Sequence, residues 1–267
     1  MYRILNFIDL FSLPGVNSSV GWFVRSQWLQ FKYTFWTSTA ALICEPLLMS
    51  LILGFGIGSY VTDVRGLPYM EFLFPGIAAL SVMMVSFTEV AYEMYRRLHL
   101  ENYYNVILQA PLTTDDIAMG EIFWAALKGT VAGISVLILG ASIGAVTSVL
   151  ATAAPLLFLI AGFFFGGLGA LVASIAKSSR AITLIQGFVF VPMALSCETI
   201  FPLSVLGSKW EMIGAWIPLT HLAEATRGMT TGHLSSRMLL NLAILIPLTM
   251  ITLNLGKVRF SKRVIPG

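Results

Sequence analysis

The sequence has little charge. Only 11% of its 267 residues are Asp, Glu, Lys or Arg, against about 25% in a typical soluble domain. With 57% hydrophobic residues and a mean hydropathy of +0.84, the chain has more apolar surface than one soluble core of this size can bury. The net charge of +3 is small and dispersed, which argues against a nucleic-acid-binding protein. A lipid bilayer is the natural solvent for such a chain.

Residue types that build soluble active sites are also scarce or scattered. The two cysteines, Cys44 and Cys197, fall in apolar runs and provide neither a disulfide framework nor a metal-binding spacing. The three histidines, His99, His221 and His233, lie far apart, so no metal site is expected. The phosphate-binding pattern GxxxxGK(S/T) does not occur, so this chain has no loop of that kind for ATP. The first residues, MYRILNFIDLF, do not predict a cleaved signal peptide.

Long apolar runs dominate the sequence and predict an all-α integral membrane protein. An apolar run of about 20 residues is enough for a helix to span a bilayer. Six spans are expected, at residues 34–60, 72–95, 117–146, 153–176, 181–198 and 236–256. They would form a single transmembrane permease domain over residues 34–267. Residues 1–33 would form a separate cytoplasmic and interfacial segment.

Within that first segment, SSVGWFVRSQWLQFKYTFW predicts an amphipathic helix lying along the membrane surface. Arg25 and Lys32 are seven residues apart and therefore share one face. The segment also holds aromatic side chains suited to the membrane interface, namely Trp22, Trp28, Tyr33 and Trp36.

The distribution of Lys and Arg around the spans predicts their orientation. If both termini are cytoplasmic, 11 of these residues flank the inner ends of the spans and 4 flank the outer ends. Cytoplasmic loops carry the excess of positive charge in membrane proteins. We therefore expect both termini to be cytoplasmic.

A polar segment, LENYYNVILQAPLTTDDIAMGEIFW at residues 100–124, separates the second and third spans. Modelling residues 100–110 as a helix places its polar side chains on one narrow face. These side chains are Glu101, Asn102, Asn105 and Gln109. Pro111 would end this helix, and Thr113 with Asp116 predicts a capping box that begins the next one. We expect this amphipathic helix to dock on a partner.

Three charged residues fall inside the expected spans: Glu45, Glu89 and Lys128. A charge near mid-bilayer costs about 2.5–3.5 kcal/mol on insertion scales, so such residues are seldom without a role. All three lie in the inner half of the bilayer. They form either a buried ion network joining the first three spans or a substrate or proton-coupling site. In both cases Lys128 is expected to approach Glu45 or Glu89.

The region between the fifth and sixth spans, residues 199–235, is too apolar for a solvated loop and too rich in Pro and Gly for a span. It predicts a re-entrant hairpin of two short helices in the outer leaflet. The second would begin at Pro218, with Glu224 and Arg227 as an i,i+3 pair. Residues expected around the outer mouth are Glu198, Trp210, Trp216 and Glu224.

Glycines four residues apart permit close approach of membrane helices. Such pairs occur at Gly129/Gly133, Gly140/Gly144 and Gly162/Gly166.

Together these features resemble the type-2 ABC exporter permeases. Glu45-Pro46 resembles the family's acidic-Pro pair in span 1, and Phe87-Thr88-Glu89 resembles its Phe-Glu pair in span 2. APLTTDDIAMGEIFWAALKGT resembles the family signature, while FLFPGIAALSVM, IFPLSVL and IPLTHLAEATRG resemble its segments at the start of span 2 and before span 6. LSCETIFP at the end of span 5 departs from the family pattern, in which Ser-Gly stands there with one residue fewer.

The resemblance implies a function. Residues 101–109 would be the coupling helix, which sits in a groove of a separate P-loop ATPase subunit. Two copies of the permease, as a homodimer in a bacterial cytoplasmic (inner) membrane, would work with two copies of that ATPase. ATP and Mg2+ would bind to the partner, and this chain would bind no cofactor and catalyse no reaction itself. The substrate would be amphipathic: a lipid-linked saccharide, a lipooligosaccharide or a hydrophobic drug.

Two other functions are compatible with the residues. A proton-coupled secondary transporter could use Glu45, Glu89 and Lys128. An intramembrane enzyme could use the reactive groups of Cys197, Glu198 or His221.

Overall fold

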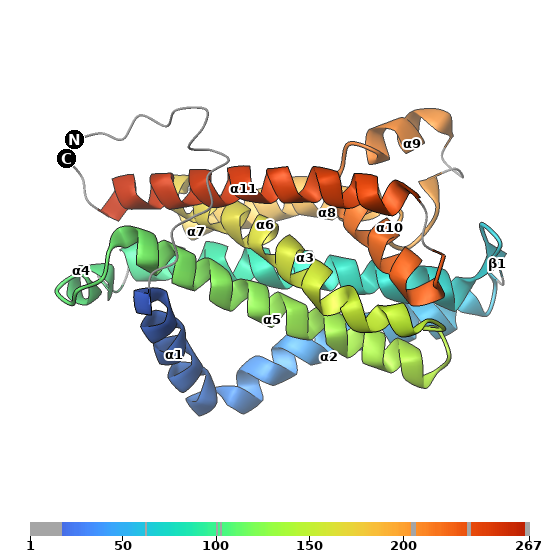
Figure 1. Ribbon diagram of the computed structural model, residues 1–267, viewed down its shortest axis with the longest axis horizontal. Helices are drawn as coiled ribbons and strands as arrows, with labels where there is room; N and C mark the ends of the chain where they lie inside the picture. Colours follow the sequence, from blue (N-terminus) through green and yellow to red (C-terminus); the bar gives the residue numbers. More distant parts are fainter. Residues whose placement is uncertain are drawn as a thin grey trace.

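The structure is a computed structural model that describes residues 18–61, 63–99, 101, 103–203, 207–233 and 236–264. Its long helices run roughly along one axis (Figure 1). Within these residues, four helical stretches are long and apolar enough to cross a membrane: Tyr69–His99, Thr114–Ser142, Val149–Ile175 and Met238–Val264. Of two shorter apolar helical pieces, Leu42–Gly58 falls within the span expected at 34–60, and Ser179–Leu195 overlaps the span expected at 181–198. The all-α membrane architecture predicted from the sequence is therefore confirmed for four spans.

The elements in chain order are α1 (Ser18–Tyr33), α2 (Phe35–Gly58), β1 (Asp63–Val64), β2 (Leu67–Pro68), α3 (Tyr69–His99), α4 (Tyr103–Ile107), α5 (Thr114–Ser142), the 3-10 helix η1 (Val149–Ala153), α6 (Ala154–Ile175), α7 (Ser179–Ile185), the π-helix η2 (Gln186–Phe190), α8 (Val191–Leu195), α9 (Ser208–Gly214), α10 (Pro218–Thr231) and α11 (Ser236–Val264). β1 and β2 form a short antiparallel hairpin. α4 and the C-terminal end of α11 lie at one end of the molecule, called the α4 end below. The β-hairpin lies at the other end, called the β-hairpin end (Figure 1).

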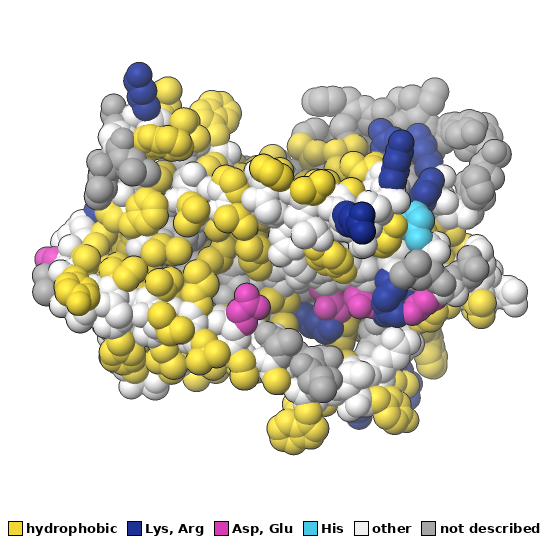
Figure 2. Space-filling model, turned by 180° about the vertical axis from the view of Figure 1, so that it is seen from behind, with side chains coloured by type: hydrophobic (Ala, Val, Ile, Leu, Met, Phe, Trp, Pro, Cys, Tyr) yellow, Lys and Arg dark blue, Asp and Glu magenta, His cyan; other side chains and the backbone are white. Residues whose placement is uncertain are grey.

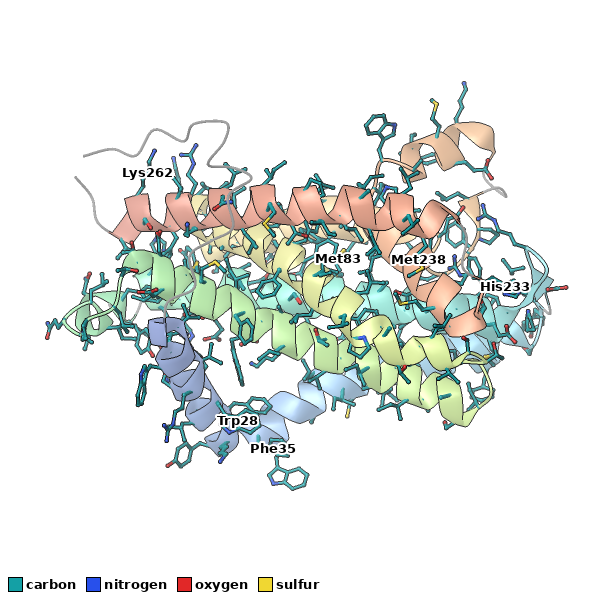
Figure 3. The ribbon with its side chains drawn as sticks, in the orientation of Figure 1. Trp28, Phe35, Met83, His233, Met238 and Lys262 are labelled. Atoms are coloured by element: carbon teal, nitrogen blue, oxygen red, sulfur yellow. The ribbon has the colours of Figure 1, made fainter. Side chains whose placement is uncertain are left out.

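Helix α3 is the centre of the bundle. It packs most extensively on α5 and α6, and also on α10 and α2. Large side chains along α3, such as Phe72, Phe87 and Met83, are fully buried. Met83 lies among the surrounding helices in Figure 3. α3 therefore sets the positions of most of the other long helices.

Glycines bring the helices together at the predicted pairs Gly129/Gly133 and Gly162/Gly166, whereas Gly144 of the third pair lies beyond the end of α5 and a Cβ there meets nothing within 4 Å. A Cβ atom added at Gly162 would lie 2.8 Å from the Cα of Ala126, and one added at Gly133 would lie 2.7 Å from a side-chain carbon of Val82. Gly129 meets Ser86 in the same way. These contacts join α5 to α6 and α3 at distances that no larger residue permits.

Helix α5 begins as predicted and ends earlier. The side chain of Thr113 accepts a hydrogen bond from the backbone of Asp116, and the Asp116 carboxylate accepts one from the backbone of Thr113, which is the expected capping box. The helix ends at Ser142 rather than continuing to 146. Gly144 has a φ of +81°, a left-handed conformation that stops helices.

The stretch expected to be the fifth span is not one regular helix. α7 continues into the π-helix η2 and then α8, which ends at Leu195. π-helical turns are rare and occur often at functional sites. The first helix of the expected outer hairpin, α9, and the second, α10, are both present, and α10 begins at Pro218 as predicted.

The expected N-terminal amphipathic helix is present as α1, and it meets α2 at an angle (Figure 1). Phe23 and Gln27 are buried against the bundle, whereas Trp22 and Trp28 are exposed. Arg25 and Lys32 lie over the rings of these two tryptophans, with cation-to-centroid distances of 5.6 Å and 5.8 Å. Trp28 and Phe35 mark the corner between the two helices in Figure 3.

We expect Gly162→Ala to destabilise the protein, because its new methyl group would collide with the backbone of α5. Overpacking of this kind costs about 1–3 kcal/mol, which should lower the melting temperature of the purified chain in detergent. Gly56→Ala in α2 is the matched control, since a Cβ there meets nothing within 4 Å. Equal melting temperatures for the two variants would contradict this account of the packing.

Candidate functional site

The polar segment between α3 and α5 forms a shorter helix than the sequence predicted. Instead of a helix over 100–110, the structure has α4 over Tyr103–Ile107 followed by turns. The hydrogen bonds from Gln109 to Val106 and from Ala110 to Ile107 span three residues, so the helix tightens before Pro111 ends it. Asn105 and Gln109 are exposed, as the docking prediction requires. Glu101 lies in a bend before the helix and is exposed, and Asn102 lies outside the described residues.

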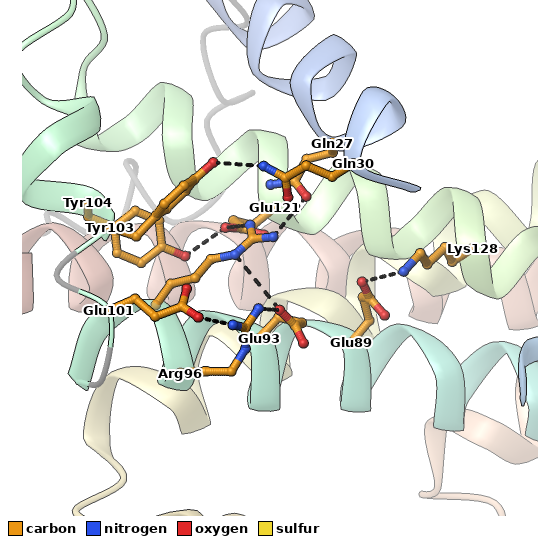
Figure 4. A network of polar contacts seen from close by, with 11 residues as sticks. Gln27, Gln30, Glu89, Glu93, Arg96, Glu101, Tyr103, Tyr104, Glu121 and Lys128 are labelled. Carbon is orange, nitrogen blue, oxygen red and sulfur yellow. Dashed lines mark hydrogen bonds and ion pairs between the residues drawn. The ribbon is translucent and has the colours of Figure 1, made fainter. Parts of the chain in front are cut away.

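A buried ion pair holds α4 to the bundle. Arg97, near the end of α3, donates to Glu121 of α5 at 2.5 Å. Tyr104 of α4 donates to the same carboxylate at 2.7 Å, and Arg97 also donates to Oε1 of Gln27 in α1 at 3.0 Å. All four side chains are buried. Four elements therefore meet at one charge pair (Figure 4).

The environment of Tyr104 fixes its protonation state. Burial, together with the Glu121 carboxylate beside it, raises the pKa of Tyr104 well above its ordinary value. The phenol therefore stays protonated and donates its hydrogen bond. Its ring packs against that of Phe260 in α11, with centroids 5.0 Å apart. α4 is thus anchored by Tyr104 and by Tyr103, whose ring lies 5.1 Å from the guanidinium carbon of Arg97, while Asn105 and Val106 on its other face are exposed.

Further ion pairs surround this end of the bundle. Arg96 pairs with Glu93 and with Glu101, so one of the expected docking residues already has an intramolecular partner. Asp115, in the first turn of α5, accepts from Ser261 at 3.0 Å and lies 3.4 Å from Lys257. The C-terminal part of α11 is therefore tied to the start of α5.

The three intramembrane charges lie on one cavity. Lys128 of α5 donates to Glu89 of α3 at 2.6 Å, which confirms the predicted approach of Lys128 to a carboxylate. Its ammonium also lies 5.4 Å from the ring centroid of Phe31 and 5.6 Å from that of Trp124. Glu45 of α2 lines the same cavity but forms no ion pair with the described residues. The network therefore joins α3 to α5 and leaves Glu45 apart.

This cavity is bounded by α1, α2, α3 and α5 and has a volume of about 530 Å³. Volumes of 300–1,000 Å³ are typical of sites for small molecules. In Figure 2, which shows the molecule from behind, most of the surface is apolar. The acidic and basic side chains gather in a hollow toward the α4 end.

At the β-hairpin end, Glu198 is held in place rather than free. Arg65, at the tip of the β-hairpin, donates to both of its carboxylate oxygens at 2.7 Å and 2.6 Å. Glu198 is 4% exposed, and its φ of 55° places it at the sharp turn that follows α8. This ion pair joins the β-hairpin to the turn that follows α8. The expected place of Glu198 at an outer mouth stays a prediction.

Arg227 does not pair with Glu224, contrary to the predicted i,i+3 interaction. It is buried and donates instead to the backbone carbonyls of Phe72 and Glu198, because these oxygens at the end of the bundle lie closer to the guanidinium. Glu224 accepts from Asn241 of α11 at 3.3 Å, and Asn241 also bonds to His221. α10 is therefore packed between α3 and α11 rather than lying at the surface.

Trp210 of α9 and Trp216, which follows it, have exposed side chains, with exposed fractions of 43% and 85%. That exposure fits the predicted place of both rings at a membrane interface.

The sequence did not single out the residues of the buried network. Glu121 lies within APLTTDDIAMGEIFWAALKGT, and Arg97 is one of the positive charges expected in the cytoplasm, but no local pattern marks either residue. Three signals in the sequence could have pointed to this network. They are a carboxylate in the apolar first turns of a span, a basic residue near the end of the preceding span, and a tyrosine between the two. Gln27 carried no such signal.

An apolar helical bundle with several helices long enough to cross a bilayer defines a multi-pass membrane protein. The sequence pattern of the ABC-2 type transporter family matches residues 19–230. The chain belongs to this family and is a membrane subunit of an ABC transporter, which associates with an ATP-binding subunit.

Individual relatives agree with this assignment. The chain is 31% identical to nodulation protein J of Bradyrhizobium diazoefficiens, over 76% of this chain and 78% of that protein. It is 29% identical to nodulation protein J of Rhizobium leguminosarum bv. viciae, over 86% and 88%. It is 23% identical to the inner membrane transport permease YadH of Escherichia coli, over 76% and 81%. Within its family, the sequence therefore resembles the proteins named nodulation protein J. No solved structure matches the chain.

We expect Lys128→Met to destabilise the protein, because it leaves the Glu89 carboxylate without its cation. Breaking one partner of a buried pair costs about 3–5 kcal/mol, and this pair, whose side chains are 15% and 24% exposed, should lie toward the lower end. The double variant Glu89→Gln/Lys128→Met should recover most of the lost melting temperature.

The control for this measurement is Lys209→Met, which removes an exposed charge from α9. A double variant as unstable as Lys128→Met alone would contradict the pairing account.

Proposed function

We propose that this chain is the permease of an ATP-driven exporter that moves an amphipathic substrate outward across a bacterial inner membrane. The observation that carries the proposal is α4, a segment anchored from within by Tyr104 and open on its other face. A separate P-loop ATPase subunit would hold ATP and Mg2+ and would receive this segment in a groove. Residues 101–109 would then transmit nucleotide-driven closure to the first three spans.

The proposal includes six spans with both termini in the cytoplasm. α2 and the stretch α7–η2–α8 would supply the two spans beyond the four long apolar helices. The excess of Lys and Arg on one side supports this orientation. It would place the α4 end in the cytoplasm and the outer region, with Trp210 and Trp216, at the opposite face. α9 and α10 would form the re-entrant hairpin, in which α10 is packed between α3 and α11.

Two copies of the chain would form the complete channel with two copies of the ATPase. Exposed apolar side chains support this arrangement, since α2 presents Ile52 at 68% exposure and η2 presents Phe188 at 78%. Lipid covers such faces in part, but a permease needs a path for its substrate between packed helices. A homodimer would provide that path at the interface between two copies.

Lipid-linked saccharides or lipooligosaccharides are the substrates we favour over hydrophobic drugs. The support comes from the relatives named nodulation protein J and from the polar cavity beside the first three spans.

The docking role of α4 can be tested with the combined substitutions Glu101→Ala, Asn105→Ala and Gln109→Ala. The chain with an affinity tag, purified from its native membranes, should carry a P-loop ATPase that mass spectrometry identifies. The triple variant should reach the membrane at the normal level and carry at least fivefold less ATPase, since several polar contacts worth about 0.5–1.5 kcal/mol each are lost.

The matched control for this variant is Ser142→Ala/Thr152→Ala, which alters exposed hydroxyl groups away from α4. Recovery of the ATPase at the wild-type ratio with the triple variant would refute the docking role.

The role of the outer region is tested by charge reversal at Glu224, which is half-buried on α10. A polar head group that leaves the channel here should meet the new cation in Glu224→Lys, so export by intact cells should fall while ATPase association stays normal. Glu198→Lys should instead lower the amount of folded protein, because it opposes Arg65 with a second positive charge. Unchanged export by Glu224→Lys at matched abundance would reduce the outer region to a structural cap.

A further inference from the structure

The cavity between α1, α2, α3 and α5 has polar walls with two aromatic rings. Amide and carboxylate groups come from Gln27, Gln30 and Glu45, and the rings from Phe31 and Trp124. The cavity lies beside the corner where α1 meets α2, at which Trp28 and Phe35 are exposed. An apolar chain in the bilayer could therefore lie against the corner while a polar group occupies the cavity.

One hydrogen-bond donor on this cavity has no acceptor. Gln27 is 3% exposed, and its Nε2 has no hydrogen-bond partner among the described residues. The amide orientation is fixed, because Oε1 of the same side chain accepts from Arg97 at 3.0 Å. A buried donor without an acceptor is destabilising, and most buried polar groups in native proteins have a hydrogen-bond partner. This amide thus points to a ligand that supplies an acceptor oxygen.

An acceptor on the same cavity also lacks a strong partner. Glu45 forms no ion pair within the described part of the chain. A ligand that satisfies both groups must accept from Gln27 and donate to Glu45. A hydroxyl group does both, since it carries one donor and two acceptor lone pairs.

The positive charges around the cavity are already neutralised. Lys128 pairs with Glu89, Arg97 with Glu121, and Arg96 with Glu93 and Glu101. With Glu45 added, carboxylates outnumber cations in this region. A phosphate or other anionic head group would find no unpaired Lys or Arg among the described residues that line the cavity, and the carboxylates would repel it.

We propose that this cavity binds the uncharged, hydroxyl-rich saccharide head group of an amphipathic substrate taken from the inner leaflet. Gln27 Nε2 donates to a sugar oxygen, Glu45 accepts from a sugar hydroxyl, and Phe31 and Trp124 supply the apolar part of the cavity wall beside the sugar. The acyl chain stays in the bilayer beside the corner of α1 and α2. The inference rests on the proposed export function and adds the site and the charge class of the substrate.

The test uses the full chain in phosphatidylcholine nanodiscs and dodecyl maltoside with a photoreactive diazirine next to the sugar. Labelling should concentrate on peptides from α1 and α5 that contain Phe31 and Trp124. Dodecyl phosphate and dodecyl trimethylammonium with the same diazirine should label these peptides at least fivefold less. Equal or stronger labelling by either charged probe would overturn the proposal.

Two variants isolate the ligand contacts. Gln27→Glu keeps the acceptor for Arg97 and removes the free donor, and Glu45→Gln keeps the shape and removes the charge. Each should reduce maltoside labelling about three- to tenfold, because Gln27→Glu loses one hydrogen bond and Glu45→Gln replaces a charge-assisted hydrogen bond by a neutral one about half as strong. Gln186→Glu on η2, away from the cavity, is the matched control and should label as wild type. Wild-type labelling in either cavity variant overturns the proposal, and Glu45→Gln decides alone where Gln27→Glu fails to fold.

Competition separates a lipid-borne head group from a free sugar. Unlabelled dodecyl maltoside should block the labelling, whereas maltose at the same concentration should not, and equal blocking by maltose would contradict a lipid-borne ligand. These nanodiscs contain no ATPase, so failure here leaves the docking of α4 untouched. Conversely, an absent ATPase in the co-purification would overturn the export function while the labelling result stood.

Discussion

The ion pair between Arg97 and Glu121 is the contact on which the α4 end of the molecule depends. Both groups are buried, and an unpaired charge in such a place is far more costly than a paired one. Arg97 can satisfy its remaining donors only if α1 lies where Gln27 can accept, and Glu121 accepts further only if α4 presents Tyr104. One pair therefore fixes the positions of α1, α3, α4 and α5 together.

The opposite end of the bundle uses the same physics with different acceptors. Arg227 is as deeply buried as Arg97, but its partners are backbone carbonyls of Phe72 and Glu198 and the face of the Phe72 ring, 3.9 Å from the guanidinium carbon. Backbone acceptors do not change with protonation or with the loss of one side chain. At the β-hairpin end, Arg227 is therefore held by main-chain acceptors, beside the side-chain ion pair of Arg65 with Glu198, whereas Arg97 at the α4 end is held by side chains.

The sequence predicted the features that follow from periodicity and local chemistry. The long apolar helices, the capping box at Thr113 and the close approach at Gly162 depend on residues near in sequence or on a single helix face. The pairing of Lys128 with Glu89 was predictable because few charges occur inside the spans, so each has few possible partners.

The missed features depend on tertiary contacts. Glu198 looked like a free carboxylate because its partner, Arg65, lies 133 residues earlier in the chain. The length of α4 was overestimated because the 3.6-residue pattern does not show where a helix tightens before Pro111. Gln27 could not be found from the sequence at all, since its role arises only when α1 packs against α5 and reaches Arg97 near the end of α3.

Gln27 connects the cavity to α4. Its Oε1 is held by Arg97, whose partner Glu121 is shared with Tyr104 of α4, and its Nε2 belongs to the cavity. A shift of α4 that moves Tyr104 changes the hydrogen bonding of Glu121, and Arg97 must then adjust, because neither buried charge can be left unpaired at low cost. That adjustment reaches the amide of Gln27. Coupling between two sites is reciprocal, so under the proposed function a head group held by Gln27 would in turn alter the free energy with which α4 docks. A permease built in this way would engage its ATPase differently when the cavity is filled than when it is empty.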